Sequence, residues 1–357
     1  MQPTHTRLDD SAKTDDQTLL DVKDLKTHFF TDEGVVKAVD GVNLSLKRGE
    51  TLCVVGESGC GKSVTARSIL RIVPSPGKIV SGEINFQQRD GEAIDLAGMN
   101  PKGREIRKIR GGEISMIFQE PMSSLSPVHT IGSQIMEAIL LHLPVSRQEA
   151  RKRAVSMLDL VGIPRPSEQL DAYSFELSGG MRQRAMIAIA LACEPQLLIA
   201  DEPTTALDVT TQANILDLIR DLQQESGMSV LFITHDLGVV AEIADEVVVM
   251  YLGRDVESGD VDSIFHNAKH PYTRALLQSI PRYDSRENRR LYSIKGTVPH
   301  PFARPNGCPF HPRCDDFIAK RCDSIDPPRH KLSQSHSIRC LLYSAADEAL
   351  PNEDMLT

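Results

Sequence analysis

The stretch from Gly56 to Ser63 constrains this chain more than any other, because it fits the pattern G-x-x-x-x-G-K-[ST]. The apolar segment 51–55 before it favours a β-strand, and the segment 64–70 after it favours a helix. A strand, a glycine-rich loop and a helix are the context in which this pattern binds phosphate. The glycines let several N–H groups turn toward one anion, and the helix adds the positive end of its dipole. The sequence therefore predicts a phosphate-binding loop rather than a chance glycine-rich turn.

Two side chains of this loop suit a nucleotide phosphate chain. Lys62 supplies a compact positive charge for the β- and γ-phosphates, and the hydroxyl of Ser63 can bind Mg²⁺. The loop residues predicted to contact the nucleotide are Gly56, Glu57, Ser58, Gly59, Cys60, Gly61, Lys62, Ser63 and Val64.

An acidic pair follows the apolar segment 197–200, which favours a buried strand. Asp201 at the end of that strand can hold Mg²⁺ beside the phosphate loop. Glu202 faces the other way and can serve as general base for an attacking water, a role worth about 10²–10⁴ in rate. The alternative is a pair of surface acids after a core strand.

Ser178, Gly179 and Gly180 precede a predicted helix and offer a second set of free N–H groups. On its own this feature is only a helix cap.

The bulk composition excludes some classes of protein. The 357 residues are 40% hydrophobic and 25% charged, as in soluble globular proteins. The net charge of −9 argues against bulk nucleic-acid binding, which favours a basic excess. The sequence contains no apolar run of about 18 residues, and its first 17 residues lack the apolar region of a signal peptide. We therefore expect a cytosolic protein that meets a membrane only through partners.

Apolar strands and helices alternate along the chain, which implies a mainly parallel sheet with helices on both faces. Strands are predicted at 19–27, 35–39, 42–46, 51–55, 114–118, 197–200, 230–234 and 247–251, with a turn at Asp40-Gly41 between the second and the third. Helices are predicted at 64–70, 131–141, 147–161, 182–192 and 209–224. The stretch 74–112 is read as less regular, with a solvated surface helix at 102–110.

Taken together, the motifs resemble those of ATP-binding cassette (ABC) ATPases. In chain order they are GESGCGKS, Gln119, LSGGM at 177–181, LLIADE at 197–202, Ala206-Leu207-Asp208 and His235. They resemble the Walker A, Q-loop, signature, Walker B, D-loop and H-loop motifs over residues 19 to about 260. The resemblance implies an α/β P-loop nucleotide-binding domain with a mainly parallel core sheet, an antiparallel β subdomain and an α-helical subdomain at about 119–193.

The resemblance also implies roles for single residues. Phe29 would stack on adenine, with Phe30 as the substitute and core packing as the alternative. Gln119 would approach Mg²⁺ and the attacking water, and His235 would contact the γ-phosphate. Asp208 would order the D-loop at a dimer interface.

Two cassettes of this family close head to tail, so that Ser178 and Gly180 of one chain complete the γ-phosphate site of the other. With a single cassette, this chain would need a second ABC ATPase subunit, and a heterodimer is expected.

Three further segments resemble oligopeptide and dipeptide permease ATPases. They are 119–127, the HPYT segment 270–277, and 302–314. Ser126 and the turn 252–255 depart from the usual pattern but touch no phosphate-contacting position. The resemblance implies a peripheral subunit at the cytoplasmic face of the inner membrane, with two membrane permease subunits, an extracytoplasmic solute-binding protein and no nucleic acid. The expected domains are a tail at 1–18, the cassette at 19–280, an extension at 281–345 and a tail at 346–357.

Two alternative functions remain open on sequence alone. The first is an importer for nickel, an opine, glutathione or another small solute. The second is a soluble ABC ATPase of DNA repair or translation, although such proteins usually carry long insertions or two cassettes.

Four cysteines of the extension, Cys308, Cys314, Cys322 and Cys340, have the spacing C-x₅-C-x₇-C-x₁₇-C. From spacing alone they are either thiolates able to meet at one soft metal or unrelated reduced thiols. The resemblance implies a four-iron four-sulfur cluster, with zinc as the second choice. Arg313 and Arg321 lie beside these positions and would offset the negative charge of a cluster.

Overall fold

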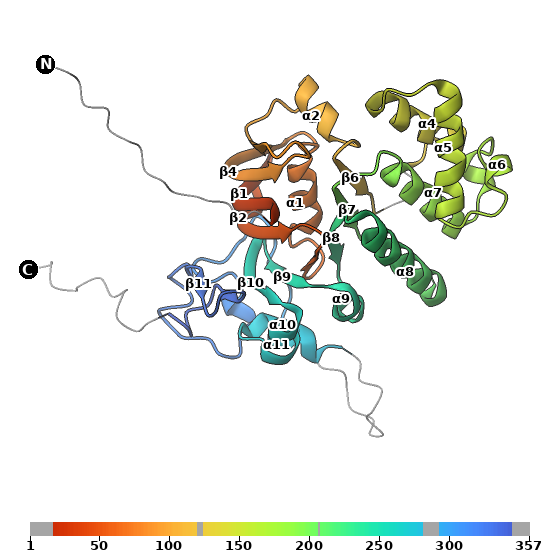
Figure 1. The fold of residues 1–357 in the computed structure, drawn as a ribbon. Helices are drawn as coiled ribbons and strands as arrows, with labels where there is room; N and C mark the ends of the chain where they lie inside the picture. Colours follow the sequence, from red (N-terminus) through yellow and green to blue (C-terminus); the bar gives the residue numbers. More distant parts are fainter. Residues whose placement is uncertain (1–16, 120–123, 206–207, 281–292, 345–357) are drawn as a thin grey trace, which may run out of the picture.

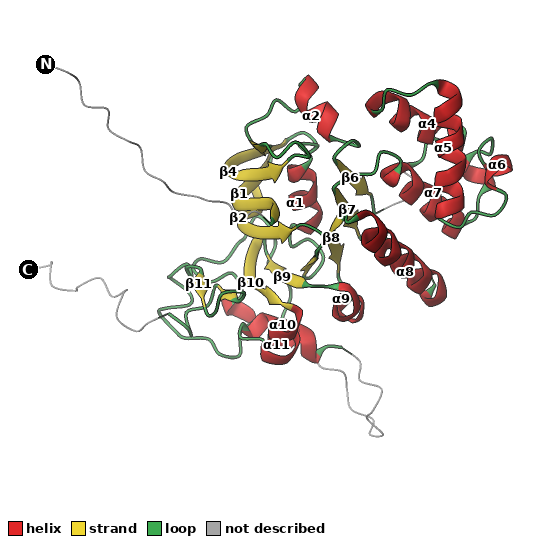
Figure 2. Ribbon diagram, viewed as in Figure 1, coloured by secondary structure: helices red, strands yellow, loops and turns green. Residues whose placement is uncertain are grey.

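The computed structural model describes residues 17–119, 124–205, 208–280 and 293–344. Two β-sheets and the helices around them form the molecule (Figures 1 and 2). None of the described helices is both long and apolar enough to cross a bilayer.

The larger sheet has the strand order β11-β12-β10-β9-β3-β8-β7-β6. Its strands are β3 (Thr51–Val55), β6 (Ile114–Ile117), β7 (Leu197–Asp201), β8 (Ser229–Thr234), β9 (Glu246–Tyr251), β10 (Arg254–Asp260), β11 (His330–Lys331) and β12 (Ser337–Ile338). The five strands from β9 to β6 run parallel, whereas β10, β11 and β12 are added antiparallel. The predicted mainly parallel sheet is confirmed, and it carries an antiparallel edge.

The smaller sheet is antiparallel, with the order β2-β1-β4-β5. Its strands are β1 (Thr18–Thr31), β2 (Gly34–Lys47), β4 (Gly77–Gln87) and β5 (Ala93–Asp95). The prediction of separate strands at 35–39 and 42–46 was wrong, because β2 is continuous. Leu25 pairs with Val42 and Lys26 with Asp40, so Gly41 is the extra residue of a β-bulge rather than part of a turn. The stretch predicted as irregular contains β4 and β5.

The α-helices are α1 (Lys62–Ile69), α2 (Arg104–Ile109), α4 (Ile131–His142), α5 (Arg147–Leu160), α6 (Pro166–Gln169), α7 (Gly179–Leu191), α8 (Val209–Ser226), α9 (Leu237–Ile243), α10 (Val261–Asn267) and α11 (Pro271–Gln278). Single 3₁₀ turns are η1 (Ser174–Glu176) and η2 (His311–Arg313). The helices α4 to α7 gather at one side of the molecule, beyond β6 and β7, and α1 lies between the two sheets (Figure 1). The predicted surface helix is α2, but it is not fully solvated, since Ile106 and Ile109 are buried.

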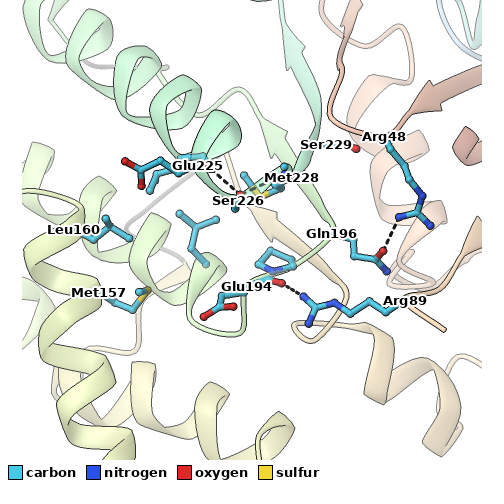
Figure 3. Close-up of a pocket in the computed structure, with 14 residues that line it drawn as sticks. Arg48, Arg89, Met157, Leu160, Glu194, Gln196, Glu225, Ser226, Met228 and Ser229 are labelled. Carbon is cyan, nitrogen blue, oxygen red and sulfur yellow. Dashed lines mark hydrogen bonds between the residues drawn. The ribbon is translucent and has the colours of Figure 1, made fainter. Parts of the chain in front are cut away.

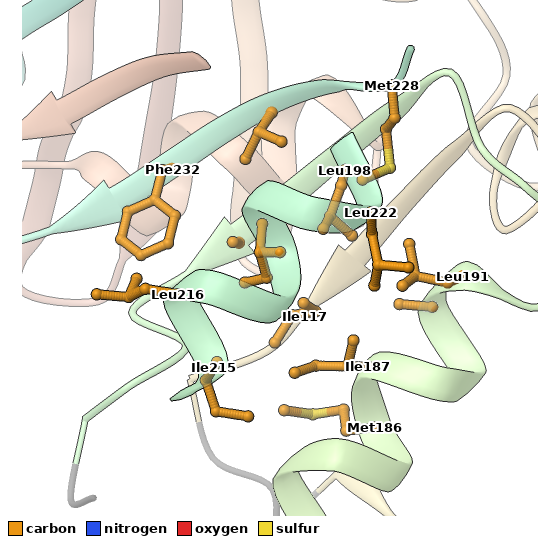
Figure 4. Packing of buried hydrophobic residues seen from close by; sticks show 14 of the residues in the cluster. Ile117, Met186, Ile187, Leu191, Leu198, Ile215, Leu216, Leu222, Met228 and Phe232 are labelled. Carbon is orange, nitrogen blue, oxygen red and sulfur yellow. The ribbon is translucent and has the colours of Figure 1, made fainter. Parts of the chain in front are cut away.

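Alternate residues of the parallel strands supply two separate hydrophobic layers. One layer packs against α7 and α8 and contains Cys53, Val55, Leu198, Ala200, Val230 and Phe232 (Figure 4). The other, with α1 and the smaller sheet, takes Leu52, Val54, Leu197, Ile199, Leu231 and Ile233. Burial on both faces explains why these strands are apolar throughout. Their carboxyl ends are thereby fixed as a rigid platform for the candidate site.

The C-terminal extension is joined to the larger sheet. Ile338 of β12 pairs with Glu257 of β10. The buried carboxylate of Glu257 accepts a hydrogen bond from His336 Nε2 at 2.8 Å if that nitrogen carries the proton. A second buried acid, Asp255, lies between Arg329 and Arg339 at 3.6 and 3.5 Å. The extension therefore shares a sheet and buried polar contacts with the cassette, while the domain boundaries remain predictions.

Candidate functional site

The predicted phosphate loop connects β3 to α1, as the sequence indicated. Gly56 has φ 150°, and a Cβ there would lie 2.2 Å from the carbonyl oxygen of Met250. Gly61 has φ 103°, and a Cβ there would lie 2.3 Å from the carbonyl oxygen of Ala38. Both positions therefore require glycine. Gly61 is also the N-cap of α1. Because glycine has no side chain to cap the first N–H groups of the helix, this helix end is suited to an anion.

The lysine of the loop, Lys62, is buried, and its ammonium group folds back onto the loop backbone. Lys62 Nζ donates to the carbonyl oxygens of Gly56 at 2.8 Å and Glu57 at 3.3 Å. Cys60 is buried beneath the loop, whereas Ser58 and Gly59 are exposed and Val64 is half-buried. The exposed side of the loop is thus the side on which a phosphate chain can enter.

Asp201 meets the loop where β7 ends. Ser63 Oγ donates to Asp201 Oδ1 at 2.8 Å, whereas Asp201 Oδ2 is buried and without a hydrogen-bond partner among the described residues. Burial raises the pKa of Asp201. A buried carboxylate oxygen beside a hydroxyl suits a hard cation such as Mg²⁺. The residues present therefore fit the predicted ion.

Three polar side chains lie within 3.3 Å of one carboxylate oxygen of Glu202. Its Oε2 accepts from Thr205 Oγ1 at 3.1 Å and from Gln119 Nε2 at 3.2 Å, and lies 3.3 Å from His235 Nδ1. Glu202 has φ 49°, a left-handed backbone conformation uncommon for a residue with a Cβ. The structure thus brings together three sequence-predicted residues, Gln119, Glu202 and His235, and adds Thr205, which sequence reasoning missed.

The second glycine-rich segment caps a different helix. Ser178 Oγ accepts from Met181 N at the start of α7, and Gly179 is open to solvent. A Cβ at Gly180 would lie 3.4 Å from Thr211 of α8, the helix that Asp208 caps through Thr211 N at 3.0 Å. No hydrogen bond recorded for the described residues links positions 178–180 to the phosphate loop, and Ala206 and Leu207 lie outside the described residues.

The two candidate aromatic residues lie on β1. Phe29 is half-buried, pairs with Val36 of β2, and has its ring 2.8 Å from where a Cβ of Gly77 would lie. Phe30 is 45% exposed, and Lys78 Nζ lies 5.8 Å from the centre of its ring. Their predicted contact with adenine remains a prediction.

The thiol of Cys340 is close enough to the other three cysteines of the extension for them to affect its pKa. Burial raises the pKa of Cys340 to about 12, and the thiols of Cys308, Cys314 and Cys322 contribute in the same direction. Cys308 N also donates to the carbonyl oxygen of Cys322 at 2.8 Å. In the described parts of the chain, however, no group of three or more His, Cys, Asp or Glu residues is placed to hold a metal ion.

The Walker A-like loop has protein partners that sequence reasoning missed. Glu57 N donates to Tyr272 Oη at 2.9 Å, and the Glu57 carboxylate binds the guanidinium of Arg313 at 2.6 and 3.0 Å. The HPYT segment was the only sequence signal for Tyr272. Arg313 was expected to offset charge at the cysteines, but its guanidinium binds Glu57 instead.

A cavity of about 650 Å³ opens at the opposite edge of the sheet, near Ser229 at the start of β8 (Figure 3). Its wall includes Met157 and Leu160 of α5, and Arg48, which donates to Gln196 at 2.8 Å. None of the predicted site residues lines it, so it is separate from the phosphate loop.

Comparison with known families accounts for most of the chain. The ABC transporter family matches residues 39–205, and the family described as "Oligopeptide/dipeptide transporter, C-terminal region" matches residues 256–322. Among solved structures, the dimeric ATP-binding cassette MJ0796, bound to ADP and Pi, has a TM-score of 0.60 and 28% identity. The alignment covers 68% of this chain and 99% of that cassette. The fold is that of an ABC ATPase cassette.

Curated relatives align over nearly their whole length. The dipeptide transport ATP-binding protein DppD of Bacillus subtilis is 49% identical over 333 residues, 93% of this chain and 97% of the relative. The protein of the same name from Escherichia coli is 45% identical over 322 residues, 90% and 96% of the two chains. A putative peptide import ATP-binding protein of Brucella melitensis is 50% identical over 333 residues, 92% and 98%. The chain therefore belongs to the oligopeptide/dipeptide family of ABC transporter ATP-binding subunits.

Proposed function

We propose that this chain is the ATP-hydrolysing subunit of a bacterial importer for di- and oligopeptides, held at the cytoplasmic face of the inner membrane by permease subunits. ATP hydrolysis is supported chiefly by one observation. The side chains of Gln119 and His235 both lie beside Glu202, and the Ser63–Asp201 pair joins this group to the phosphate loop. The peptide part is supported by what the relatives' names say of those proteins. We assign residues 19–280 to the cassette and 281–345 to the extension.

In this proposal the loop residues Gly56 to Val64 hold ATP, with Lys62 at the β- and γ-phosphates and Phe29 at adenine. Ser63, Asp201 and Gln119 would hold Mg²⁺, which supplies neutralisation of the developing phosphate charge when bound. Glu202 accepts a proton from the attacking water, which makes it the general base. His235, whose Nδ1 lies 3.3 Å from Glu202, would contact the γ-phosphate.

A second cassette would complete the site. Ser178, Gly179 and Gly180 would bind the γ-phosphate held by the partner, and Asp208 would order the segment between the two active sites. The exposure of Ser178 and Gly179 supports this arrangement, because an open helix N-terminus is free to meet a phosphate from another subunit. A different ABC ATPase is the proposed partner.

Two integral membrane permease subunits would dock on the helical part. A hollow of about 750 Å³ lies between α4 and α5, and Leu141, which lines it, is 72% exposed. The hollow therefore offers an apolar surface on which a permease subunit could dock. Val128, which lies between Gln119 and α4 in the sequence, is 74% exposed. Exposed apolar side chains of this kind favour a protein partner. An extracytoplasmic solute-binding protein would deliver cargo to the permease subunits, and no nucleic acid takes part.

We also propose that Cys308, Cys314, Cys322 and Cys340 hold a four-iron four-sulfur cluster, with zinc as the second choice. The proposal is supported by the chemistry of four neighbouring thiols, while the described geometry has no preformed metal site. Iron and acid-labile sulfide analysis of anaerobically purified protein tests it. Zinc without sulfide would refute the iron–sulfur assignment.

Another small solute, such as nickel, an opine or glutathione, is the second candidate cargo, because this subunit does not itself select cargo. A soluble role in DNA repair or translation is a third and more distant reading.

Purification of the tagged chain from gently solubilised native membranes tests the importer. Two multi-span membrane proteins and a second cassette ATPase are the expected companions. Recovery of soluble partners alone, under several mild conditions, would refute the importer and favour the soluble ATPase.

A further inference from the structure

The second residue of the phosphate loop is held by the C-terminal part of the chain. The backbone N–H of Glu57 donates to the hydroxyl of Tyr272, which lies 215 residues later on α11. Its carboxylate forms a two-pronged pair with Arg313, which lies 256 residues later on η2. The backbone N–H and the carboxylate of Glu57 are thus both held by contacts with distant residues of the same chain.

Arg313 is itself firmly positioned. Its side chain is only 4% exposed, and its Nε donates to the carbonyl oxygen of Lys295 at 2.9 Å. The guanidinium carbon lies 5.8 Å from the ring centre of Tyr251 and 6.0 Å from that of Phe310. A planar guanidinium that is packed on aromatic rings and bound at both prongs has little freedom to move.

The rings around Arg313 form a small buried aromatic cluster, consisting of Tyr251, Tyr272 and Phe310. Their ring centres are 4.7 to 5.3 Å apart, and each side chain is at most 2% exposed. Tyr251 ends β9, and the turn that follows donates from Gly253 N to the Cys60 carbonyl oxygen at 2.8 Å. The cluster therefore contacts the phosphate loop at Glu57 through Tyr272, and the turn that follows Tyr251 contacts the loop at Cys60.

The conformation of Glu57 matters for the loop lysine. Lys62 Nζ donates to the carbonyl oxygens of Gly56 and Glu57, so a shift of the Glu57 backbone would move the groups that hold the ammonium in place. A displacement near 1 Å in such a preorganised site is enough to weaken ligand binding markedly.

We propose that Tyr272 and Arg313 form a clamp on Glu57 that positions the phosphate loop, so that nucleotide affinity depends on α11, through Tyr272, and on the C-terminal extension, through Arg313. Both are positioning residues, because they act through Glu57. The inference rests on the phosphate-binding role given above to the loop, and it does not depend on any metal at the cysteines.

The test measures binding of a fluorescent ATP analogue to the full-length chain. Tyr272→Phe removes one hydroxyl and keeps the aromatic cluster, and it should weaken binding by about two- to tenfold, the usual worth of one neutral hydrogen bond. Arg313→Gln and Glu57→Gln should each weaken it by about tenfold or more, because each leaves a charged partner unpaired. Arg313→Lys, which keeps the charge but loses the fork, should lie between wild type and Arg313→Gln.

Two further measurements separate positioning from mere stability. The double variant Glu57→Gln/Arg313→Gln should lose clearly less affinity than the sum of the single losses, since both single variants break one contact. The matched control is Arg329→Gln, which breaks an arginine–Asp255 pair between the extension and β10. It should leave nucleotide affinity unchanged even where it lowers the melting temperature.

Wild-type affinity in both Tyr272→Phe and Glu57→Gln would overturn the clamp, whatever happens to Arg313→Gln, which can fail by misfolding. An equal loss of affinity in Arg329→Gln would also overturn it, because any loosening of the extension would then suffice. Failure of the wild-type chain to bind the analogue would instead refute the proposed role of the loop.

Discussion

Replacing Glu202 by Gln tests the chemistry at the end of β7. The change removes a charge and a proton acceptor while keeping the shape of the side chain, which is 13% exposed. The amide oxygen can still accept from Thr205 and Gln119, as Oε2 does at 3.1 and 3.2 Å. We therefore expect nearly unchanged stability and nucleotide binding.

The expected loss lies in turnover. A positioned general base is worth about 10²–10⁴ in rate, which corresponds to about 3–5 kcal/mol of activation free energy at about 1.4 kcal/mol per factor of ten. The assay is phosphate release by the full-length chain with its partner cassette, alongside binding of a fluorescent ATP analogue.

The matched control is Thr205→Ala, which removes one hydrogen bond to the same carboxylate oxygen. Thr205 is exposed, so water can replace its hydroxyl at the Glu202 carboxylate, and the control should lose about tenfold or less. Turnover of Glu202→Gln within tenfold of wild type, with normal nucleotide binding, would refute the assignment of Glu202 as general base.

Three further predictions concern the buried groups. Asp201→Asn should lower Mg²⁺-dependent phosphate release by about a hundredfold or more, since the metal stabilises the transition state by several kcal/mol. It should keep or raise the melting temperature, because burial disfavours the charged carboxylate, as the raised pKa of Asp201 indicates. Phe232→Ala should cost about 3–5 kcal/mol in urea unfolding, because Phe232 is fully buried between the sheet and α8; a loss under 1 kcal/mol would contradict the packing. Complete burial lowers the pKa of His270 to about 3 from 6.5, so the unfolded chain takes up the extra proton first as pH falls. The His270 contribution to stability is therefore complete above about pH 6.5 and falls by about 2 kcal/mol at pH 5; His270→Asn, which keeps a helix-capping acceptor, should remove this dependence.

Local patterns predicted the parts of the site that lie at strand ends. Residues 51–55 and 197–200 favour strands because both faces of these strands are buried, and this pattern, together with G-x-x-x-x-G-K-[ST] at 56–63 and the acidic pair at 201–202, indicated where the site begins. The proximity of Gly56 and Asp201 could then be expected although β8 lies between β3 and β7, because the carboxyl ends of parallel strands in one sheet lie along the same edge.

Contacts between distant segments could not be predicted in this way. The partners of Glu57 lie 215 and 256 residues away, and no periodicity links Glu57 to Tyr272 or Arg313. The bulge at Gly41 looked like a turn, since Asp-Gly favours turns until a neighbouring strand fixes the register. The short strand β12 was missed because two residues carry no period.

Uptake of a labelled dipeptide by intact cells tests the central claim most directly. A strain that lacks this chain is complemented with either the wild-type chain or Glu202→Gln, at matched levels of protein. We expect the wild-type chain to restore ATP-dependent uptake and Glu202→Gln to fail to restore it. Equal uptake with both chains would contradict the ATPase mechanism, and unchanged uptake in the deletion strain would contradict the peptide cargo.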